Sequence, residues 1–286
     1  MDSPSVAGAY RFAITPGAAT VFDVEARLYP RRTIADAGAA PLTSMFWFGG
    51  PDPLPDASAD YRSAVHDSDG LEILSGAGER LWRPLASPAR LQTSAFADHN
   101  PRGFGLTQRA RAFDAYGDLT ARYDRRPSAW IEPSGDWGAG AVMLVELPTR
   151  TEYEDNIVAF WRPAEPWMAG SEVRLAYRLS WGDGVSPPTG LARVIRSRQG
   201  AADPAPARLF TIDFPGGSIP TDRAIRLDVT ASAGQVISAD VQRSADPDLM
   251  RASFRYMPPA RGAAELRARL MADNQPASET WAWRWS

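Results

Sequence analysis

The sequence predicts an all-β chain: a large antiparallel β-sandwich followed by an immunoglobulin-like β-sandwich. Apolar and polar residues alternate in 22–28 and again in 173–181. This period of two is typical of strands that bury one face and expose the other. The 23 glycines and 25 prolines lie scattered between such runs, where they are typical of turns.

Further strands are predicted where short apolar or alternating runs are bounded by turn residues. In chain order they are 81–85, 91–96, 141–147, 157–161, 208–214, 225–231, 236–241 and 251–257. The segment 263–272 is ambiguous, because Leu266 and Leu270 are four residues apart as on a helix face. Its apolar residues also alternate with charged ones, and we favour a strand. The final Trp281, Trp283 and Trp285 would share one face of a closing strand.

The stretch GDGVSPPTG interrupts the strand pattern and predicts a domain boundary. We expect one domain in residues 1–182, a linker in 183–190 and a second domain in 191–286. The second part has the length and strand number of an immunoglobulin-like sandwich. The first part is richer in aromatic residues and carries the candidate chemistry.

The composition excludes several reaction mechanisms. All 31 basic residues are arginines, cysteine is absent, and the two histidines are His66 and His99. Lysine Schiff bases, thiol nucleophiles and thiolate metal sites are therefore excluded. The net charge of -3 argues against nucleic acid as a partner. No apolar run approaches the ~18 residues of a membrane span, residues 1–12 carry no secretory signal, and we expect no metal and no cofactor.

Two acidic clusters are candidates for acid–base chemistry. His66-Asp67-Ser68-Asp69-Gly70 resembles part of a calcium loop, although a plain turn with Gly70 at positive φ is the simpler interpretation. Glu152 to Asn156 places three carboxylates directly before an apolar run. Neighbouring carboxylates can raise one another's pKa, which keeps a carboxylic acid protonated. The alternative is a solvated acidic loop.

Arginines and aromatic residues interleave between Arg102 and Arg126, with Arg109 and Tyr123 among them. This pattern could form a groove for a polyhydroxylated chain, or it could be solvated arginines on an alternating strand. Tryptophans such as Trp130 and Trp161 could stack on sugars, although a tryptophan is more often part of a core.

Several long motifs resemble the periplasmic glucan biosynthesis protein G/D family. They are APLTSMFWFG (40–49), HDSDGL (66–71), WRPL (82–85), NPRGFGLTQR (100–109), ARYDRRPSAWIEPSGDWGAGAV (121–142), EDNIVAFW (154–161) and the closing SETWAWRW. The resemblance covers nearly the whole chain from Val6.

The resemblance implies a two-domain periplasmic protein that acts on osmoregulated periplasmic glucans, which have a β-1,2-linked glucose backbone. It further implies an inverting β-1,2-glucanase with Asp155 as general acid and Asp67 as general base. Tyr123 and Glu152 would line the cleft, and Trp130, Trp161 and Arg109 would be further substrate-binding residues. The alternative is a glucan-binding factor without catalysis that assists backbone assembly or branching.

The resemblance also implies a longer protein. Members of the family carry a signal peptide and a longer N-terminal part of the first sandwich than this sequence has. We expect a sandwich without those strands to expose unpaired edges and core, and therefore to be poorly soluble and of low activity alone. A nonfunctional remnant of a longer gene is the third possibility.

Overall fold

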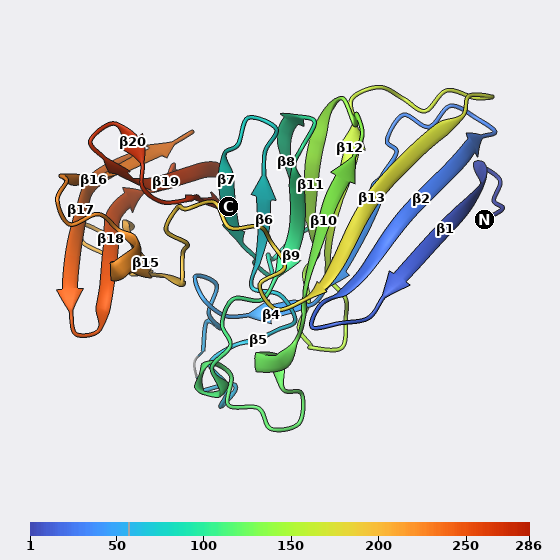
Figure 1. The fold of residues 1–286 in the computed structure, drawn as a ribbon. Coiled ribbons are helices and arrows are strands. Elements are labelled where there is room, and N and C mark those ends of the chain that lie inside the picture. The colour runs from blue at the N-terminus through green and yellow to red at the C-terminus, as the bar shows by residue number, and fades with distance from the viewer. Residues whose placement is uncertain (57) are drawn as a thin grey trace.

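The computed structural model describes residues 1–56 and 58–286, and these residues are mostly β-strand (Figure 1). The longest sheet runs β1–β2–β13–β10–β9–β6–β7–β21–β19–β16 and lies along the whole molecule. Its strands are β1 (Val6–Thr15), β2 (Thr20–Pro30), β13 (Val173–Gly182), β10 (Ser128–Ser134), β9 (Gly103–Thr107), β6 (Gly70–Leu74), β7 (Arg80–Pro84), β21 (Thr280–Trp285), β19 (Ala264–Ala272) and β16 (Ile225–Ala231). The short β20 (Gln275–Pro276) pairs with β19.

A four-stranded sheet faces the first half of this long sheet and completes the large sandwich. Its order is β3 (Ala39–Ser44), β12 (Ile157–Pro163), β11 (Ala139–Glu146) and β8 (Gln92–His99). Alternate residues of the two sheets meet in one core, which includes Leu71, Phe104 and Ile131 from one side and Val142 and Leu144 from the other. These side chains are at most 1% exposed, so their burial supplies the main stabilisation of this sandwich.

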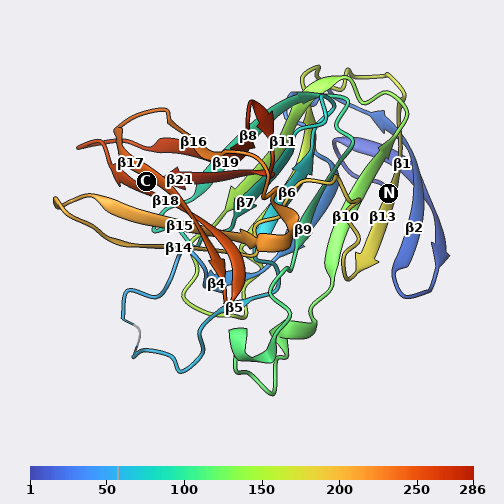
Figure 2. The same ribbon diagram turned by 60° about the vertical axis from the view of Figure 1, so that its left-hand side comes forward.

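A second four-stranded sheet packs on the other end of the long sheet and forms the smaller sandwich (Figure 2). Its order is β14 (Arg196–Ala201), β15 (Arg208–Pro215), β18 (Asp248–Met257) and β17 (Gln235–Ala245), and η3 (Gly216–Ser218) follows β15. Phe210 and Phe254 stack at 5.1 Å, and both meet Trp281 edge-on. The aromatic cluster therefore holds this sheet against β21.

Two short strands and a long loop project beyond the large sandwich. The strands are β4 (Phe46–Phe48) and β5 (Val65–His66), and the loop between β9 and β10 contains η1 (Phe113–Ala115) and η2 (Tyr123–Arg125). A separate small core of Met45, Phe48, Val65, Tyr116 and Tyr123 joins the strands to the loop. This projection carries the candidate acidic residue Asp67.

A buried network of charges joins the two sandwiches. Glu72 of β6 contacts Arg80, lies 3.0 Å from Arg109 and lies 2.9 Å from Arg193. Glu279, directly before β21, contacts both Arg109 and Arg80 and accepts a hydrogen bond from the Val194 amide. Both glutamates are 0% exposed. Separating the two sandwiches would leave these buried charges without partners, which costs much free energy. The network therefore links the two sandwiches firmly.

The long sheet continues across the predicted boundary, because β21 pairs in parallel with β7 through Thr280–Leu81 and Trp281–Trp82. Residues 183–190 contain no regular strand, and Arg80 donates hydrogen bonds to Ser186 and Pro187 within them. The division into 1–182, 183–190 and 191–286 stays a prediction.

The predicted all-β class is confirmed, and each predicted strand falls on an observed one. The ambiguous segment 263–272 is strand β19, and Trp281, Trp283 and Trp285 lie on one face of β21 against the smaller core. The prediction missed strands such as β6 and β9. Four of the five residues in β6 and all five in β9 are buried, so neither strand has the polar face that creates alternation.

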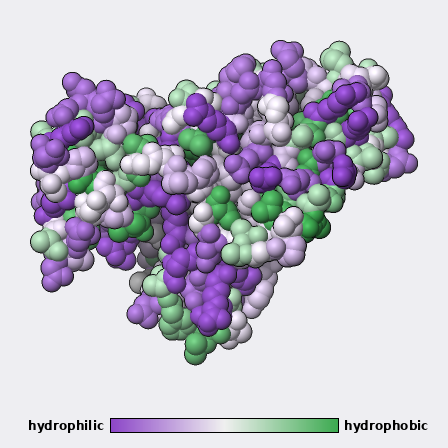
Figure 3. Space-filling view, in the orientation of Figure 1, coloured by the Kyte–Doolittle hydropathy of each residue, from purple (hydrophilic) through white to green (hydrophobic). Residues whose placement is uncertain are grey.

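Strand β1 forms one edge of the long sheet and leaves apolar side chains exposed. Tyr10, Phe12 and Ile14 are 41%, 55% and 58% exposed, and they share one face of the strand. Figure 3 shows patches of apolar surface over the end of the molecule formed by β13, β2 and β1. Poor solubility of the isolated chain stays a prediction, and this exposed edge is its physical reason.

Among the described residues, no helix is long and apolar enough to cross a membrane.

The buried network predicts a strong dependence of stability on Glu279. Glu279→Ala leaves the guanidinium groups of Arg109 and Arg80 without this partner, and we expect it to lower the free energy of unfolding by about 3–5 kcal/mol. The control is Glu265→Ala, which removes a half-exposed pair with Arg284 and should cost less than about 1 kcal/mol. Urea denaturation measures both, and equal losses would contradict the assignment.

Candidate functional site

Asp67 follows strand β5 and is held by backbone contacts to the neighbouring chain. Its amide donates a hydrogen bond to the Met45 carbonyl at 2.9 Å. Its side chain is 31% exposed, and Oδ1 lies 3.2 Å from Nε of Arg126. The carboxylate is therefore reachable from solvent while it is paired with a cation.

Asp155 lies in the exposed loop between β11 and β12, and the next residue anchors that loop. The side-chain amide of Asn156 accepts a hydrogen bond from Phe46 N at 2.8 Å and donates to Phe46 O at 2.9 Å. It also donates to Leu147 O at 2.9 Å. Met45, which holds Asp67, directly precedes Phe46, which holds Asn156. Asp67 and the loop that carries Asp155 are therefore anchored to consecutive residues.

The two aspartates also interact electrostatically. Burial raises the pKa of Asp67, the Arg126 guanidinium lowers it, and the charge of Asp155 raises it. A charge acts on a neighbouring pKa only over a short range. The hydrogen bonds to Met45 and Phe46 thus bring the HDSDG and EDNIV segments together, although Asp67 and Asp155 are 88 positions apart in the sequence.

Tyr123 and Glu152 belong to a polar network beside Asp67. The Tyr123 hydroxyl donates to Glu152 Oε2 at 2.9 Å, and Arg62 contacts Glu152 and lies 3.0 Å from Asp118. Burial raises the pKa of Tyr123, and the hydrogen bond to Glu152 raises it further. The phenol therefore stays protonated and can act as a hydrogen-bond donor. The Arg126 guanidinium lies 5.5 Å from the centre of the Tyr123 ring, so this network is continuous with Asp67.

Three of the predicted substrate-binding residues lie elsewhere. Trp130 and Trp161 are 0% and 1% exposed, and Trp161 is part of the large core. Arg109 is held by Glu72 and Glu279, and its guanidinium lies 3.6 Å from the centre of the Trp82 ring. Because protein surrounds these groups, a sugar has no free ring face or guanidinium to contact. The candidate site consists of Asp67, Asp155, Tyr123 and Glu152.

Two local interpretations of the sequence are wrong. Gly70 does not adopt positive φ but lies within β6, where an added Cβ would fall 2.1 Å from Trp82. Close packing of the indole is therefore the reason for a glycine there. The segment after Thr107 is not an alternating strand of solvated arginines, because the chain leaves the sheet and forms the loop with η1 and η2.

Sequence reasoning did not single out the residues that connect the site. Arg62 binds Asp60, Asp118 and Glu152, although no local motif marks it. Asn156 was visible only as part of the EDNIV motif, and its role depends on contacts with a distant strand. Within residues 1–56 and 58–286, no group of three acidic or histidine side chains is arranged to hold a metal ion.

The arrangement can support acid–base chemistry on a polyhydroxylated substrate. It offers an exposed carboxyl group (Asp155) and, in a separate connected network, a partly buried carboxylate held by a cation (Asp67) and a second carboxylate (Glu152) that accepts from Tyr123.

Comparison with known proteins matches the chain to one family of glucan biosynthesis proteins. The family described as "Periplasmic glucan biosynthesis protein, MdoG" matches residues 1–285. A "Glucans biosynthesis protein G" of Rhodopseudomonas palustris strain BisA53 is 50% identical over 288 residues, which cover 100% of this chain and 56% of the relative. One of Shewanella baltica strain OS155 is 48% identical over 292 residues, which cover 100% of this chain and 53% of the relative. The chain therefore spans about half the length of these relatives. On this evidence, the chain belongs to the periplasmic glucan biosynthesis protein MdoG family.

Proposed function

We propose that this chain is the acid–base part of a periplasmic protein that acts on β-1,2-glucan as an inverting glycoside hydrolase. Asp155 is the general acid, which gives its proton to the leaving glycosidic oxygen. Asp67 is the general base, which takes a proton from the attacking water, directly or through a sugar hydroxyl. The water oxygen then bonds to the anomeric carbon from the opposite face of the ring.

The observation that carries this proposal is that Asp67 and the loop of Asp155 are held by the consecutive residues Met45 and Phe46. The Asp67 amide donates to the Met45 carbonyl, and Asn156, directly after Asp155, exchanges two hydrogen bonds with Phe46. The charge of Asp155 also raises the pKa of Asp67. An inverting mechanism needs two carboxyl groups held near each other with room for water between them. Anchoring to consecutive residues fixes their relative position without direct contact.

The surroundings of each carboxyl group support its proposed role. Burial raises the pKa of Asp67, which makes the carboxylate a stronger base, and the Arg126 guanidinium lowers that pKa and so favours the ionised form. Asp155 is exposed, so a glycosidic oxygen can reach it.

Glu152 is proposed to hold the sugar, and Tyr123, which is 2% exposed, to position Glu152. The Tyr123 hydroxyl donates its one proton to Glu152 Oε2, and the carboxylate remains able to accept hydrogen bonds from sugar hydroxyls. The guanidinium of Arg62 contacts the Glu152 carboxylate and holds it in place. Because the chain spans only about half of its relatives, activity is to be measured on the whole gene product.

Replacing the proposed acid should abolish turnover while binding persists. Asp155→Asn keeps the shape of the side chain but has no proton to donate, and we expect a loss of about 10²–10⁴-fold in kcat on linear β-1,2-glucan. The affinity for the glucan should change little. Wild-type turnover in this variant would contradict the proposal, and a wild-type protein that binds glucan without releasing shorter products would favour the non-catalytic alternative. The matched control is Glu154→Gln, one residue earlier in the same loop.

The pH dependence of kcat/KM should change when the charge of Arg126 is removed. A general base works only when deprotonated, so kcat/KM falls as the pH drops through the pKa of Asp67. Since Arg126 lowers that pKa, Arg126→Gln should move the acidic limb of the profile to higher pH by about one unit. Arg125→Gln, at the exposed neighbouring arginine, should leave the limb in place. A limb that does not move, or that moves to lower pH, would exclude Asp67 as the base.

A further inference from the structure

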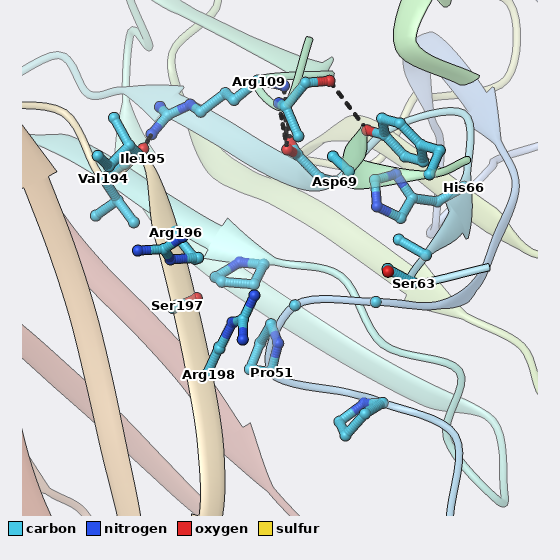
Figure 4. Close-up of a pocket in the computed structure, with 18 of the residues that line it drawn as sticks. Pro51, Ser63, His66, Asp69, Arg109, Val194, Ile195, Arg196, Ser197 and Arg198 are labelled. Atoms are coloured by element: carbon cyan, nitrogen blue, oxygen red, sulfur yellow. Dashed lines mark hydrogen bonds between the residues drawn. The ribbon is translucent and has the colours of Figure 1, made fainter. Parts of the chain in front are cut away.

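A cleft lies between the two sandwiches, and the candidate site at Asp67 and Asp155 is not part of it. Its volume is about 920 Å³, and neither Asp67 nor Asp155 lines it. One wall comes from β4, β5 and the loop that begins at Gly49, and the other from residues 194–199 leading into and along β14 (Figure 4). The side chain of Gln199 donates to Pro51 O at 2.7 Å, which joins the walls at one end. This size is typical of pockets that bind small molecules.

His66 presents a hydrogen-bond acceptor to this cleft, and the neighbouring contacts fix which ring nitrogen it is. Gln108 Nε2 donates to the carbonyls of His66 and Tyr123, so Gln108 Oε1 faces the ring. Oε1 can only accept, and therefore Nδ1 of His66, 3.0 Å away, carries the proton. Burial lowers the pKa of His66 to about 4, which keeps the ring neutral. Nε2 is thus left with a free lone pair.

Gly49 packs closely against the ring of His66, where a Cβ would also fall 2.9 Å from Ala64 Cβ. A Cβ at position 49 would lie 3.1 Å from Nε2 and 3.0 Å from Cδ2 of His66. Both residues line the cleft, and His66 is itself 3% exposed. Because His66 lines the cleft, its Nε2 is an acceptor for a ligand hydroxyl that enters from the cleft.

The rest of the lining offers donors and acceptors of balanced charge. The charged residues that line the cleft are Arg109, Arg196, Arg198, Asp69, Asp114 and Asp248. Three positive and three negative charges do not select an ion of either sign. Arg198 forms no ion pair with another described residue, while Ser63 contributes a hydroxyl on the opposite side. Arg109 is held by Glu72 and Glu279, and Arg196 by Asp213. The guanidinium donors of Arg198, the neutral imidazole acceptor and the Ser63 hydroxyl together suit a neutral polyol.

We propose that this cleft is a second carbohydrate site, which binds neutral glucose units separately from the site at Asp67 and Asp155. His66 and Asp67 are consecutive, and the strand ending between them sends successive side chains to opposite faces. The cleft therefore lies behind the proposed catalytic site, across β5. The choice of glucose rests on membership of the glucan family, and binding here does not require hydrolysis.

The test uses the fact that the chain has only two histidines. In whole protein labelled with ¹⁵N at histidine, we expect the β-1,2-linked glucose disaccharide to shift the Nε2 resonance of His66 saturably, because a hydroxyl donates to its lone pair. The resonances of His99, which lies on β8 and outside the cleft, should not move. This signal does not depend on turnover, so it distinguishes failure of this proposal from failure of the proposed hydrolase.

Blocking variants complete the test. Ser63 is exposed at the cleft, so Ser63→Trp should fill the space without unfolding the protein and should abolish the His66 shift. Ser238→Trp, at an exposed position of β17, is the matched control and should leave the shift intact. Arg198→Ala should weaken binding at least threefold, whereas Arg255→Ala should not. An unmoved His66 signal, a titration that survives Ser63→Trp, or a shift caused by inorganic phosphate and not by the disaccharide would overturn the proposal.

Discussion

The burial of Glu72 and Glu279 among arginines is the constraint on which the arrangement of the two sandwiches depends. Arg109 and Arg80 each contact both glutamates, and Arg80 also holds the connecting residues Ser186 and Pro187. A buried charge without a partner is costly, so neither sandwich can shift far without breaking the network. The same contacts fix the two walls of the cleft at Val194 and Arg109.

The short strand β5 and Asp67, directly after it, lie between two different environments. His66 faces the cleft between the sandwiches, and Asp67 faces Arg126 and Tyr123. Gln108 fixes His66 from one side, and the Met45 carbonyl fixes Asp67 from the other. Two different environments are thus built around consecutive residues, which keeps the imidazole neutral and leaves the carboxylate paired with a cation.

Much of the fold could be predicted because alternation of side chains reports one-sided burial directly. It identified β2, β13 and β19, whose polar faces meet water. It could not identify β9, which is buried on both faces, or the loop with η1 and η2, whose shape depends on packing against β4 and β5. For the candidate site, the sequence named the two aspartates through a family resemblance. Nothing local could show that Asn156 and Met45 anchor them.

The sequence by itself determined the β-rich class, the family and the types of group available for chemistry, because these follow from composition, periodicity and contiguous motifs. It excluded lysine and cysteine mechanisms outright. Tertiary structure alone decided which aromatic and charged groups remain accessible. Trp130, Trp161 and Arg109 matched a sugar-binding pattern in sequence, yet packing encloses them, while Asp155 stays exposed. Accessibility depends on contacts between residues far apart in the chain, and no local pattern records those contacts.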